Sequence, residues 1–356
     1  MIAHRVSETS ALRERLARSL DERREPGAAE LCDALERLLD GADASPDTIS
    51  LERLQKGVYR LRVGGGSDRT LVLKRHTPAI AHTDRLVAER WLPALGLGER
   101  CPRLLAAAAQ REGRWVWHVY EDLRSETLAD RCERPRLEAA VDLIAQLHTR
   151  GAGHPLLPEV RWLARDHGGR SLITNLRDGI GALEALATVR TPEFAQARSH
   201  LLERLYRLLE EAPDRIRLMV EAGGPDTLLH GDLGPKNIFV ALASDGPCAR
   251  LVDWDHVGVG PAGYDVSTLL YQSSPEERPW ILRRYREAVE RAGYRLAPDD
   301  ELNRLFHTAE TARGVNCVIW PAMALLNDGA EWGRSGLVDI EAWFETLRPP
   351  LSDGVA

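Results

Sequence analysis

The chain has 356 residues, of which 44% are hydrophobic and 28% charged, and its formal net charge is −7. This composition is typical of a soluble globular protein, and the length allows about two domains or lobes. The acidic net charge argues against a general nucleic-acid binder, which needs a basic surface. The longest apolar run, residues 317–326, contains Pro321 and is too short to cross a membrane.

The first twenty residues are charged throughout, so they do not resemble a secretory signal. The five cysteines are scattered and form no CxxC pair. Such thiols suit a reducing compartment, and we therefore expect a cytoplasmic protein.

The N-terminal third of the chain is predicted to change from helix to strand. Leucines recur on one face of two short segments within residues 7–41, which predicts two helices. Alternating apolar residues then predict five strands and one helix, with GGGSD as a hairpin turn between the second and third strands. The strands are expected at 49–57, 58–66, 69–76, 103–109 and 114–123, and the helix at 83–91, disturbed by Pro93.

Beyond residue 125 the pattern is mostly helical. Apolar stripes with helical spacing occur around 137–147 and 201–209, and three further helices are expected at 281–293, 301–313 and 338–347. The sequence therefore predicts an α+β fold with a small sheet-rich lobe followed by a larger helical lobe.

Three oxygen-bearing side chains stand beside two strand-like runs. Asp232 lies in HGDLGPKN, Asn237 follows five residues later, and Asp253 directly follows the apolar residues of the strand-like segment ARLVDWD. If the two runs pair as a hairpin, these side chains converge at one end of it. Carboxylate and amide oxygens suit Mg²⁺ bound together with substrate phosphates, and Asp232 could then accept a proton from a hydroxyl. The alternative is that both motifs are ordinary turns.

These motifs resemble those of the aminoglycoside-phosphotransferase-like kinases, a family with the protein-kinase fold. The resemblance rests on HGDLGPKN (230–237), VDWD (252–255), Lys74 in LVLK and Glu89 in VAER, and it covers approximately residues 50–345. It implies a two-lobed fold with a small antiparallel sheet and a helical lobe. It also implies transfer of the γ-phosphoryl group of ATP or GTP, with Mg²⁺ as cofactor.

The resemblance also implies roles for single residues. Asp232 matches the catalytic base, and Asn237 and Asp253 match the metal ligands. Lys74 matches the lysine that binds the α- and β-phosphates, and Glu89 its ion-pair partner. A compact ammonium group suits phosphate, which explains a lysine at position 74 in a chain with 44 arginines and three lysines.

Three positions leave alternatives open. Lys74 could be a solvent-exposed lysine, and Glu89 an exposed helix charge with Asp84 as the nearby acidic alternative. Lys236 could reach phosphate or substrate, or be a solvated turn residue. His230 and Asp265 are expected to brace the HGD turn.

The nucleotide-binding segments show one match and one departure. By resemblance, the backbone of Glu121 and Leu123 in YEDL would hydrogen-bond the nucleotide base. LQKGVYRLRV has one glycine, Gly57, where a protein kinase has three. GVGPAG (258–263) fits a dinucleotide-binding pattern, but Pro261 and its context argue against that function.

The phosphoryl acceptor is expected to be a small molecule. Gly231 stands where protein kinases carry an arginine, and only eleven residues separate Asp253 from Asp265, which leaves little room for an activation segment. Residues 256–356 contain 15 acidic and 10 basic residues, and an acidic pocket there would attract a polycation such as an aminoglycoside. A solvated acidic surface is the alternative.

We therefore predict a cytoplasmic kinase that phosphorylates a hydroxyl of a small molecule, with an aminoglycoside-type antibiotic as the first candidate. The alternatives are a kinase of choline, an amino alcohol or a sugar, and an inactive nucleotide-binding regulator. The expected domains are an N-terminal helical extension (1–48), a nucleotide-binding lobe (49–123) and a helical lobe with the catalytic loop and acceptor site (124–356). No nucleic-acid or membrane partner is expected.

Overall fold

The computed structural model of the chain describes residues 18, 20, 25–39, 44–65, 69–188, 192–244 and 246–351. It divides into two compact units, Met1–Glu126 with Phe239–Asp255 (unit 1) and Thr127–Ile238 with His256–Ala356 (unit 2). Most of the first predicted helix and most of the GGGSD turn lie outside the described residues. The chain passes from one unit to the other at 126/127, 238/239 and 255/256.

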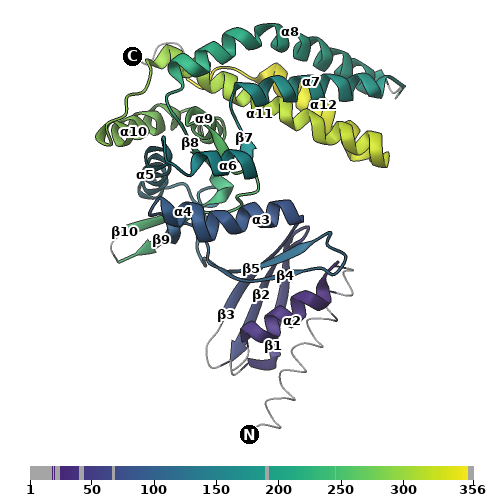
Figure 1. Cartoon of the computed structure of the whole chain (residues 1–356), viewed down its shortest axis with the longest axis vertical. Helices are drawn as coiled ribbons and strands as arrows, with labels where there is room; N and C mark the ends of the chain where they lie inside the picture. Colours follow the sequence, from purple (N-terminus) through teal and green to yellow (C-terminus); the bar gives the residue numbers. More distant parts are fainter. Residues whose placement is uncertain are drawn as a thin grey trace. The chain divides into compact units, whose positions relative to one another are not determined.

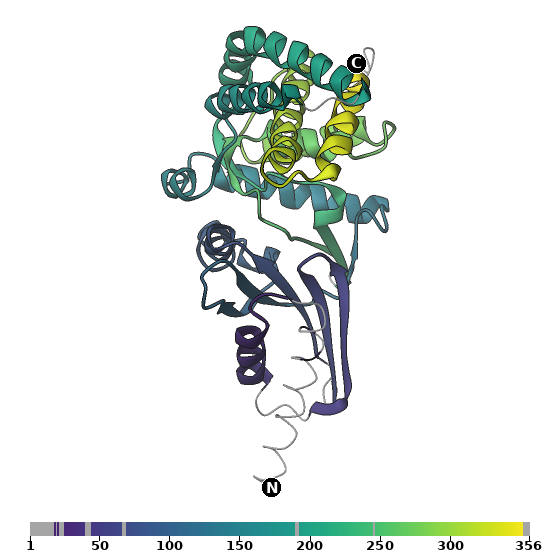
Figure 2. The same cartoon turned by 90° about the vertical axis from the view of Figure 1, so that its right-hand side faces the viewer.

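Unit 1 is built on a five-stranded antiparallel sheet with the strand order β1-β2-β3-β5-β4 (Figure 1). Its strands are β1 (Ala44–Gln55), β2 (Val58–Gly65), β3 (Arg69–His76), β4 (Leu104–Ala109) and β5 (Val116–Glu121). Helix α2 (Ala28–Leu39) packs on this sheet (Figure 2). All five predicted strands are present, as is the second of the two predicted N-terminal helices.

The two faces of the sheet differ in polarity because side chains alternate along each strand. On one face, Leu71 and Leu73 of β3 and Trp117 of β5 are buried in one apolar cluster with Leu31 and Leu35 of α2. The other face carries polar side chains of the same strands. In the β3–β5 register Lys74 lies opposite His118. The sheet therefore has an apolar core on one side and polar groups on the other.

Helix α3 (Pro78–Leu86) covers the polar face and contacts β3 and β5. Helix α3 continues as a π-helical turn, η1 (Val87–Trp91), and ends in α4 (Leu92–Ala94). Pro93 explains the irregular turn, since proline has no N–H for a carbonyl four residues earlier. The predicted helix is thus present, and it is disturbed where Pro93 was expected to disturb it.

The remaining elements of unit 1 come from both of its segments, Met1–Glu126 and the later Phe239–Asp255. The short 3-10 helix η2 (Gly98–Arg100) precedes β4, and β6 (Glu126–Thr127) stands at the boundary between the units. The later segment contributes the paired strands β9 (Ile238–Ala243) and β10 (Gly246–Leu251). Arg250 of β10 donates to the Glu121 carboxylate of β5 at 3.0 Å, which ties this hairpin to the sheet.

Unit 2 is mainly helical. Its helices are α5 (Arg134–Gly151), α6 (Leu157–Leu163), α7 (Gly169–Ala185), η3 (Leu186–Thr188), α8 (Pro192–Ala222), η4 (Pro235–Asn237), α9 (Gly263–Tyr271), α10 (Arg278–Arg291), α11 (Asp299–Asp328) and α12 (Glu331–Thr346). Helices α7, α8, α11 and α12 lie side by side around one apolar cluster (Figures 1 and 2). The predicted α+β class is confirmed. Within the described residues, no helix combines the length and apolar character that a membrane span requires.

A small three-stranded sheet in unit 2 holds the segments that carry the predicted chemistry. Its strands are β7 (Arg165–Asp166), β8 (Asp226–Leu229) and β11 (Gly258–Pro261), in the order β7-β11-β8. Strand β8 ends at Leu229, directly before His230, and β11 leads into α9, which carries Asp265. The HGD turn and its expected brace therefore start from neighbouring strands.

Candidate active site

The HGD turn in unit 2 depends on a glycine. Gly231 has a φ of +84°, a conformation that side chains with a Cβ rarely adopt. A Cβ at this position would lie 2.0 Å from the His256 carbonyl oxygen and 2.9 Å from Nε2 of His167. The close approach leaves no room for the arginine that protein kinases carry before the catalytic aspartate.

A buried carboxylate holds the turn in this shape. Asp265 accepts hydrogen bonds from the backbone N–H groups of His230 (2.7 Å) and Gly231 (2.9 Å) and from Nε2 of His148 (3.3 Å). Burial alone would raise the pKa of Asp265, but these donors and the nearby histidines lower it below its usual value. Asp265 therefore braces the turn as an ionised carboxylate, as the sequence predicted.

His148 extends this network into the helical core. Because a carboxylate can only accept, Nε2 of His148 carries the proton that faces Asp265, and in the neutral ring Nδ1 accepts from the Tyr285 hydroxyl at 2.8 Å. Both His148 and Tyr285 are buried. Helices α5, α9 and α10 therefore meet at the group that shapes the turn.

The structure brings Asp232 and Asn237 together within unit 2. The Asn237 amide nitrogen donates to the Asp232 carbonyl (2.8 Å) and to the Asp232 carboxylate (3.1 Å). Lys236 forms an ion pair with the same carboxylate at 3.2 Å. Asn237 is 4% exposed, whereas the Asp232 side chain is 23% exposed. Since Asn237 uses its nitrogen for Asp232, its carbonyl oxygen is the atom suited to a cation.

The lysine that follows Asp232 stands two residues later than in many protein kinases, at Lys236, and Gly234 takes the earlier position. Gly234 occupies the place where many protein kinases have a lysine, and a Cβ there would lie 2.2 Å from the Gln272 side-chain oxygen. Lys236 stands two residues later and reaches back to Asp232, although 62% of its side chain is exposed. The turn lysine is thus in contact with the proposed catalytic carboxylate.

Unit 1 brings together Lys74 and Asp253. The Lys74 ammonium group contacts the carboxylates of Asp253 at 2.5 Å and Asp255 at 2.8 Å. Although burial lowers the pKa of Lys74, the two carboxylates outweigh it and raise this pKa above its usual value. Asp253 has a φ of +67°, a strained conformation for a residue with a side chain, and such strain concentrates at functional positions.

Asp255, the last residue of VDWD, has no role predicted from the sequence. It lies between the Lys74 ammonium and Nδ1 of His76, which is 3.5 Å away. Burial raises the pKa of Asp255, as does the like charge of Asp253, while Lys74 opposes this shift. The alternation of acidic residues in VDWD was the signal that could have identified it.

Glu89 does not form the ion pair that was expected for it. Lys74 pairs with Asp253 and Asp255, whereas Glu89 pairs with Arg85 at 2.7 Å, one helical turn away. Glu89 lies on the solvent side, with 49% of its side chain exposed, whereas Asp84 is buried on the same helical segment. The helix therefore turns Asp84 toward the sheet and Glu89 away from it, and Asp84 pairs with His118 and Tyr120.

The predicted hinge follows the end of β5. The Glu121 carboxylate binds Arg103 and Arg250, and its backbone N–H donates to the Arg103 carbonyl at 3.1 Å. A contact between Glu121 and a nucleotide base would therefore have to use the backbone carbonyl of Glu121. The complementary donor would be the N–H of Leu123.

The fold, together with the HGDLGPKN and VDWD motifs, indicates a kinase-type phosphotransferase. A model of the phosphotransferase enzyme family matches residues 50–298, and the chain belongs to this family. The resemblance to aminoglycoside-phosphotransferase-like kinases is thereby confirmed. The chain is a phosphotransferase that acts on hydroxyl groups of small molecules. No curated protein sequence matches it.

Several solved structures share the fold at low sequence identity. The GDP complex of an aminoglycoside 2′-phosphotransferase is 15% identical with a TM-score of 0.59, covering 89% of this chain and 98% of the other. Plasmodium vivax ethanolamine kinase is 12% identical with a TM-score of 0.55, covering 85% and 82%. A spectinomycin phosphotransferase, solved with ADP and spectinomycin, is 12% identical with a TM-score of 0.53, covering 85% and 90%.

Proposed function

We propose that this protein transfers the γ-phosphoryl group of ATP or GTP to a hydroxyl of a small molecule, with Mg²⁺ as cofactor. The observation that carries this proposal is the geometry of Asp232. Its partly exposed carboxylate contacts Asn237 and Lys236, in a turn whose backbone donates to the buried Asp265. In the proposed mechanism this carboxylate accepts the proton of the attacking hydroxyl. Such general-base assistance contributes about 10²–10⁴ in rate.

The donor set fits the cofactor that the family implies. Asn237 offers an amide oxygen and Asp253 a carboxylate, and both are ligands that Mg²⁺ accepts together with phosphate oxygens. When bound, Mg²⁺ would neutralise the charge that develops on the phosphoryl group. We propose that Lys74, which contacts Asp253 and Asp255 in this structure, binds the α- and β-phosphates of the nucleotide.

We further propose that residues 49–123 bind the nucleotide, with Glu121 and Leu123 contacting the base through their backbone, and that residues 124–356 bind the acceptor. Residues 1–48 are proposed as a helical extension outside the catalytic machinery. Glu89 is given no part in the proposed mechanism. We propose a cytoplasmic location, because the five cysteines form no disulfide and the reaction needs a nucleoside triphosphate.

For the acceptor we propose an aminoglycoside-type antibiotic first, because residues 256–356 carry five more acidic than basic residues. Modification of such a compound would make the protein an antibiotic-resistance enzyme. A metabolite alcohol such as an amino alcohol is the second candidate, since an ethanolamine kinase is among the proteins with the same fold. A coupled assay of nucleoside diphosphate release over aminoglycosides, amino alcohols, choline and sugars distinguishes them.

The role of Asp232 is tested with Asp232→Asn. We expect turnover to fall about a hundredfold or more, with nucleotide affinity unchanged. Asp214→Asn, a change at a 75% exposed carboxylate in unit 2, serves as the control and should leave turnover unchanged. Turnover of the Asp232 variant close to that of the wild type would remove this residue from the mechanism.

The role of Asp253 is tested by nucleotide titration with and without Mg²⁺. We expect Asp253→Ala to abolish the Mg²⁺-dependent part of the affinity, because it removes a carboxylate ligand. An Mg²⁺ dependence equal to that of the wild type would contradict this assignment.

A further inference from the structure

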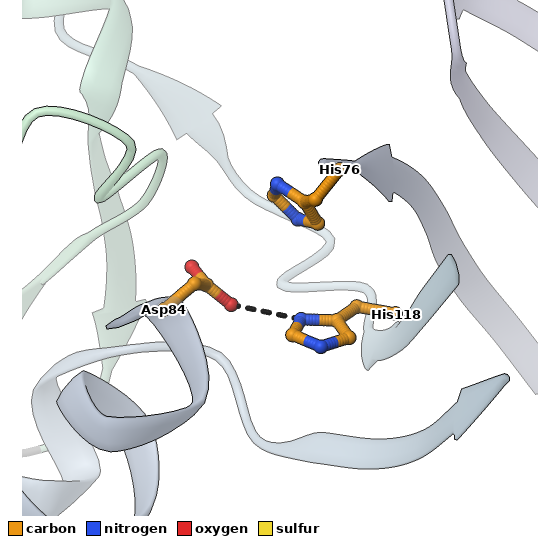
Figure 3. A group of neighbouring side chains, drawn as sticks. All are labelled: His76, Asp84 and His118. Carbon is orange, nitrogen blue, oxygen red and sulfur yellow. Dashed lines mark hydrogen bonds and ion pairs between the residues drawn. The ribbon is translucent and has the colours of Figure 1, made fainter. Parts of the chain in front are cut away.

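A second group of metal-ligand side chains lies in unit 1, apart from the residues assigned to catalysis. His76 of β3, His118 of β5 and Asp84 of α3 each offer one ligand atom, and these three atoms lie within 4.8 Å of one another (Figure 3). Their exposed fractions are 3%, 1% and 7%. The group is therefore built into the interior between the sheet and α3.

Strand geometry explains why these residues meet. His76 lies two residues beyond Lys74 on β3, and His118 faces Lys74 in the β3–β5 register, so both imidazoles stand on the polar face of the sheet. Tyr120, two residues after His118, is on the same face. Asp84 comes from the buried side of α3, which covers this face. An apolar helix face would be the simpler way to cover a sheet, so this polar cluster calls for a reason.

The distances fit a small cation. Nδ1 of His118 lies 3.0 Å from Oδ2 of Asp84 and 2.9 Å from the Tyr120 hydroxyl, and Nε2 of His76 lies 3.5 Å from the same hydroxyl. Ligand atoms around a tetrahedral Zn²⁺ with bonds of about 2.0–2.2 Å are about 3.3–3.6 Å apart, which lies between the 3.0 Å of the His118–Asp84 pair and the 4.8 Å that bounds the whole group. Tyr120 and His118 both contact Oδ2, so the other carboxylate oxygen is not needed for either bond.

The orientation of His76 also suits a metal ligand. Its Nε2 lies 3.5 Å from the Tyr120 hydroxyl, inside the cluster. His76 points its other nitrogen, Nδ1, toward Asp255 at 3.5 Å, the kind of carboxylate partner that orients metal-bound histidines.

We propose that His76, Asp84 and His118 form a structural transition-metal site, and that its two nitrogens and one carboxylate oxygen select Zn²⁺. Tyr120 is not one of the three ligands, and its hydroxyl lies beside them as a donor to Asp84. The site is distinct from the proposed Mg²⁺ ligands, which are oxygen atoms. It ties α3 to the strand that carries Lys74. It does not depend on the proposed phosphotransfer mechanism, because zinc binding is measured without nucleotide.

The test uses the full chain, stripped with a chelator and reloaded with Zn²⁺ or Co²⁺. We expect about one zinc per chain by mass spectrometry, and at least a tenfold loss of affinity in Asp84→Asn and His118→Gln. His82→Gln, an exposed histidine on α3, and Asp253→Ala should bind zinc like the wild type. X-ray absorption of the zinc-loaded wild type should show two imidazoles and no sulfur.

Three results would overturn the proposal. They are a wild-type chain that retains no zinc after reloading, equal zinc affinity in the wild type and the ligand variants, and a zinc spectrum with sulfur or fewer than two imidazoles. The first would mean that the cluster is held by hydrogen bonds alone. The spectrum of the wild type decides the matter even where a variant fails to fold.

Discussion

Each unit contains a histidine, an aspartate and a tyrosine that are joined by hydrogen bonds, but the donors that reach the aspartate differ. In unit 2, Asp265 receives two backbone N–H groups in addition to His148, and Tyr285 contacts the far side of that histidine. In unit 1, Asp84 receives only the side chains of His118 and Tyr120 among its hydrogen bonds in the described structure. The first cluster is therefore fixed to the main chain and the second is not.

This difference separates two functions for the same residue types. A carboxylate that accepts backbone N–H groups determines the path of the chain, as Asp265 does for the HGD turn. A carboxylate held by side chains alone can give up a hydrogen bond from one of them and bind a metal ion instead, because no backbone N–H then loses its acceptor. The origin of the donors, more than the identity of the residues, distinguishes a brace from a candidate ligand site.

The largest effect is expected from removing the brace. Asp265→Ala would leave two backbone N–H groups and His148 without their acceptor in a fully buried position. Breaking such a buried charged network costs about 3–5 kcal/mol in the free energy of unfolding. Urea denaturation should show this loss, whereas the exposed Asp178→Asn on α7 should change stability by less than about 0.5 kcal/mol. A loss for Asp265→Ala as small as the control would mean that the turn holds its shape without the carboxylate.

The next effect concerns the turn itself. Gly231→Ala adds a Cβ beside the His256 carbonyl to the strain of a positive φ, and we expect a loss of about 3 kcal/mol together with most of the activity. Gly153→Ala is a matched control. Gly153 also has a positive φ, +64°, but nothing lies within 4 Å of its Cβ position. It should cost only about 1 kcal/mol, so equal losses in a melting experiment would show that backbone strain alone limits position 231.

A smaller loss of stability is expected when the hydroxyl of Tyr285 or Tyr120 is removed. Tyr285→Phe removes the hydroxyl that His148 accepts from, and should cost about 1–2 kcal/mol because a buried nitrogen loses its partner. Tyr120→Phe removes a donor to Asp84 in the metal-free protein and should cost a similar amount there. With zinc bound, we expect the cost of Tyr120→Phe to decrease while that of Tyr285→Phe stays constant. Denaturation of both variants with and without zinc provides the measurement, and an unchanged cost for Tyr120→Phe would count against a role of the metal at Asp84.

The sequence predicted the parts of the site that are local. HGDLGPKN contains Asp232 and Asn237 within one turn, so their proximity follows from spacing, whereas the ion pair of Lys236 with Asp232 was not predicted. The five strands were identified from alternation, and their order in the sheet is that of a chain in which neighbours mostly pair. The pairing of Asp232 with Asn237 needed no knowledge of distant residues.

The parts that the sequence could not predict depend on helix phase and on contacts between distant residues. Glu89 and Asp84 lie five residues apart and face different sides of their helical segment, so only the packing of this segment on the sheet decides which of them is buried. His76, Asp84 and His118 are separated by up to 42 positions, and no spacing pattern connects them. Alternation along β3 puts His76 on the same face as Lys74, but the register that brings His118 opposite Lys74 is set by the pairing of β3 with β5 and not by sequence spacing.

The smallest effect is a dependence of stability on pH. Burial lowers the pKa of the half-buried His167 below 6.5, although its hydrogen bond to the His256 carbonyl opposes this shift. The unfolded chain then binds more protons than the folded chain just below pH 6.5, so stability should decrease as the pH falls through this range. One proton limits the slope to about 1.4 kcal/mol per pH unit. His167→Gln keeps a donor for the carbonyl but cannot titrate, so its free energy of unfolding between pH 5 and about 7 should depend less on pH than that of the wild type. Equal slopes would show that His167 is not the group responsible.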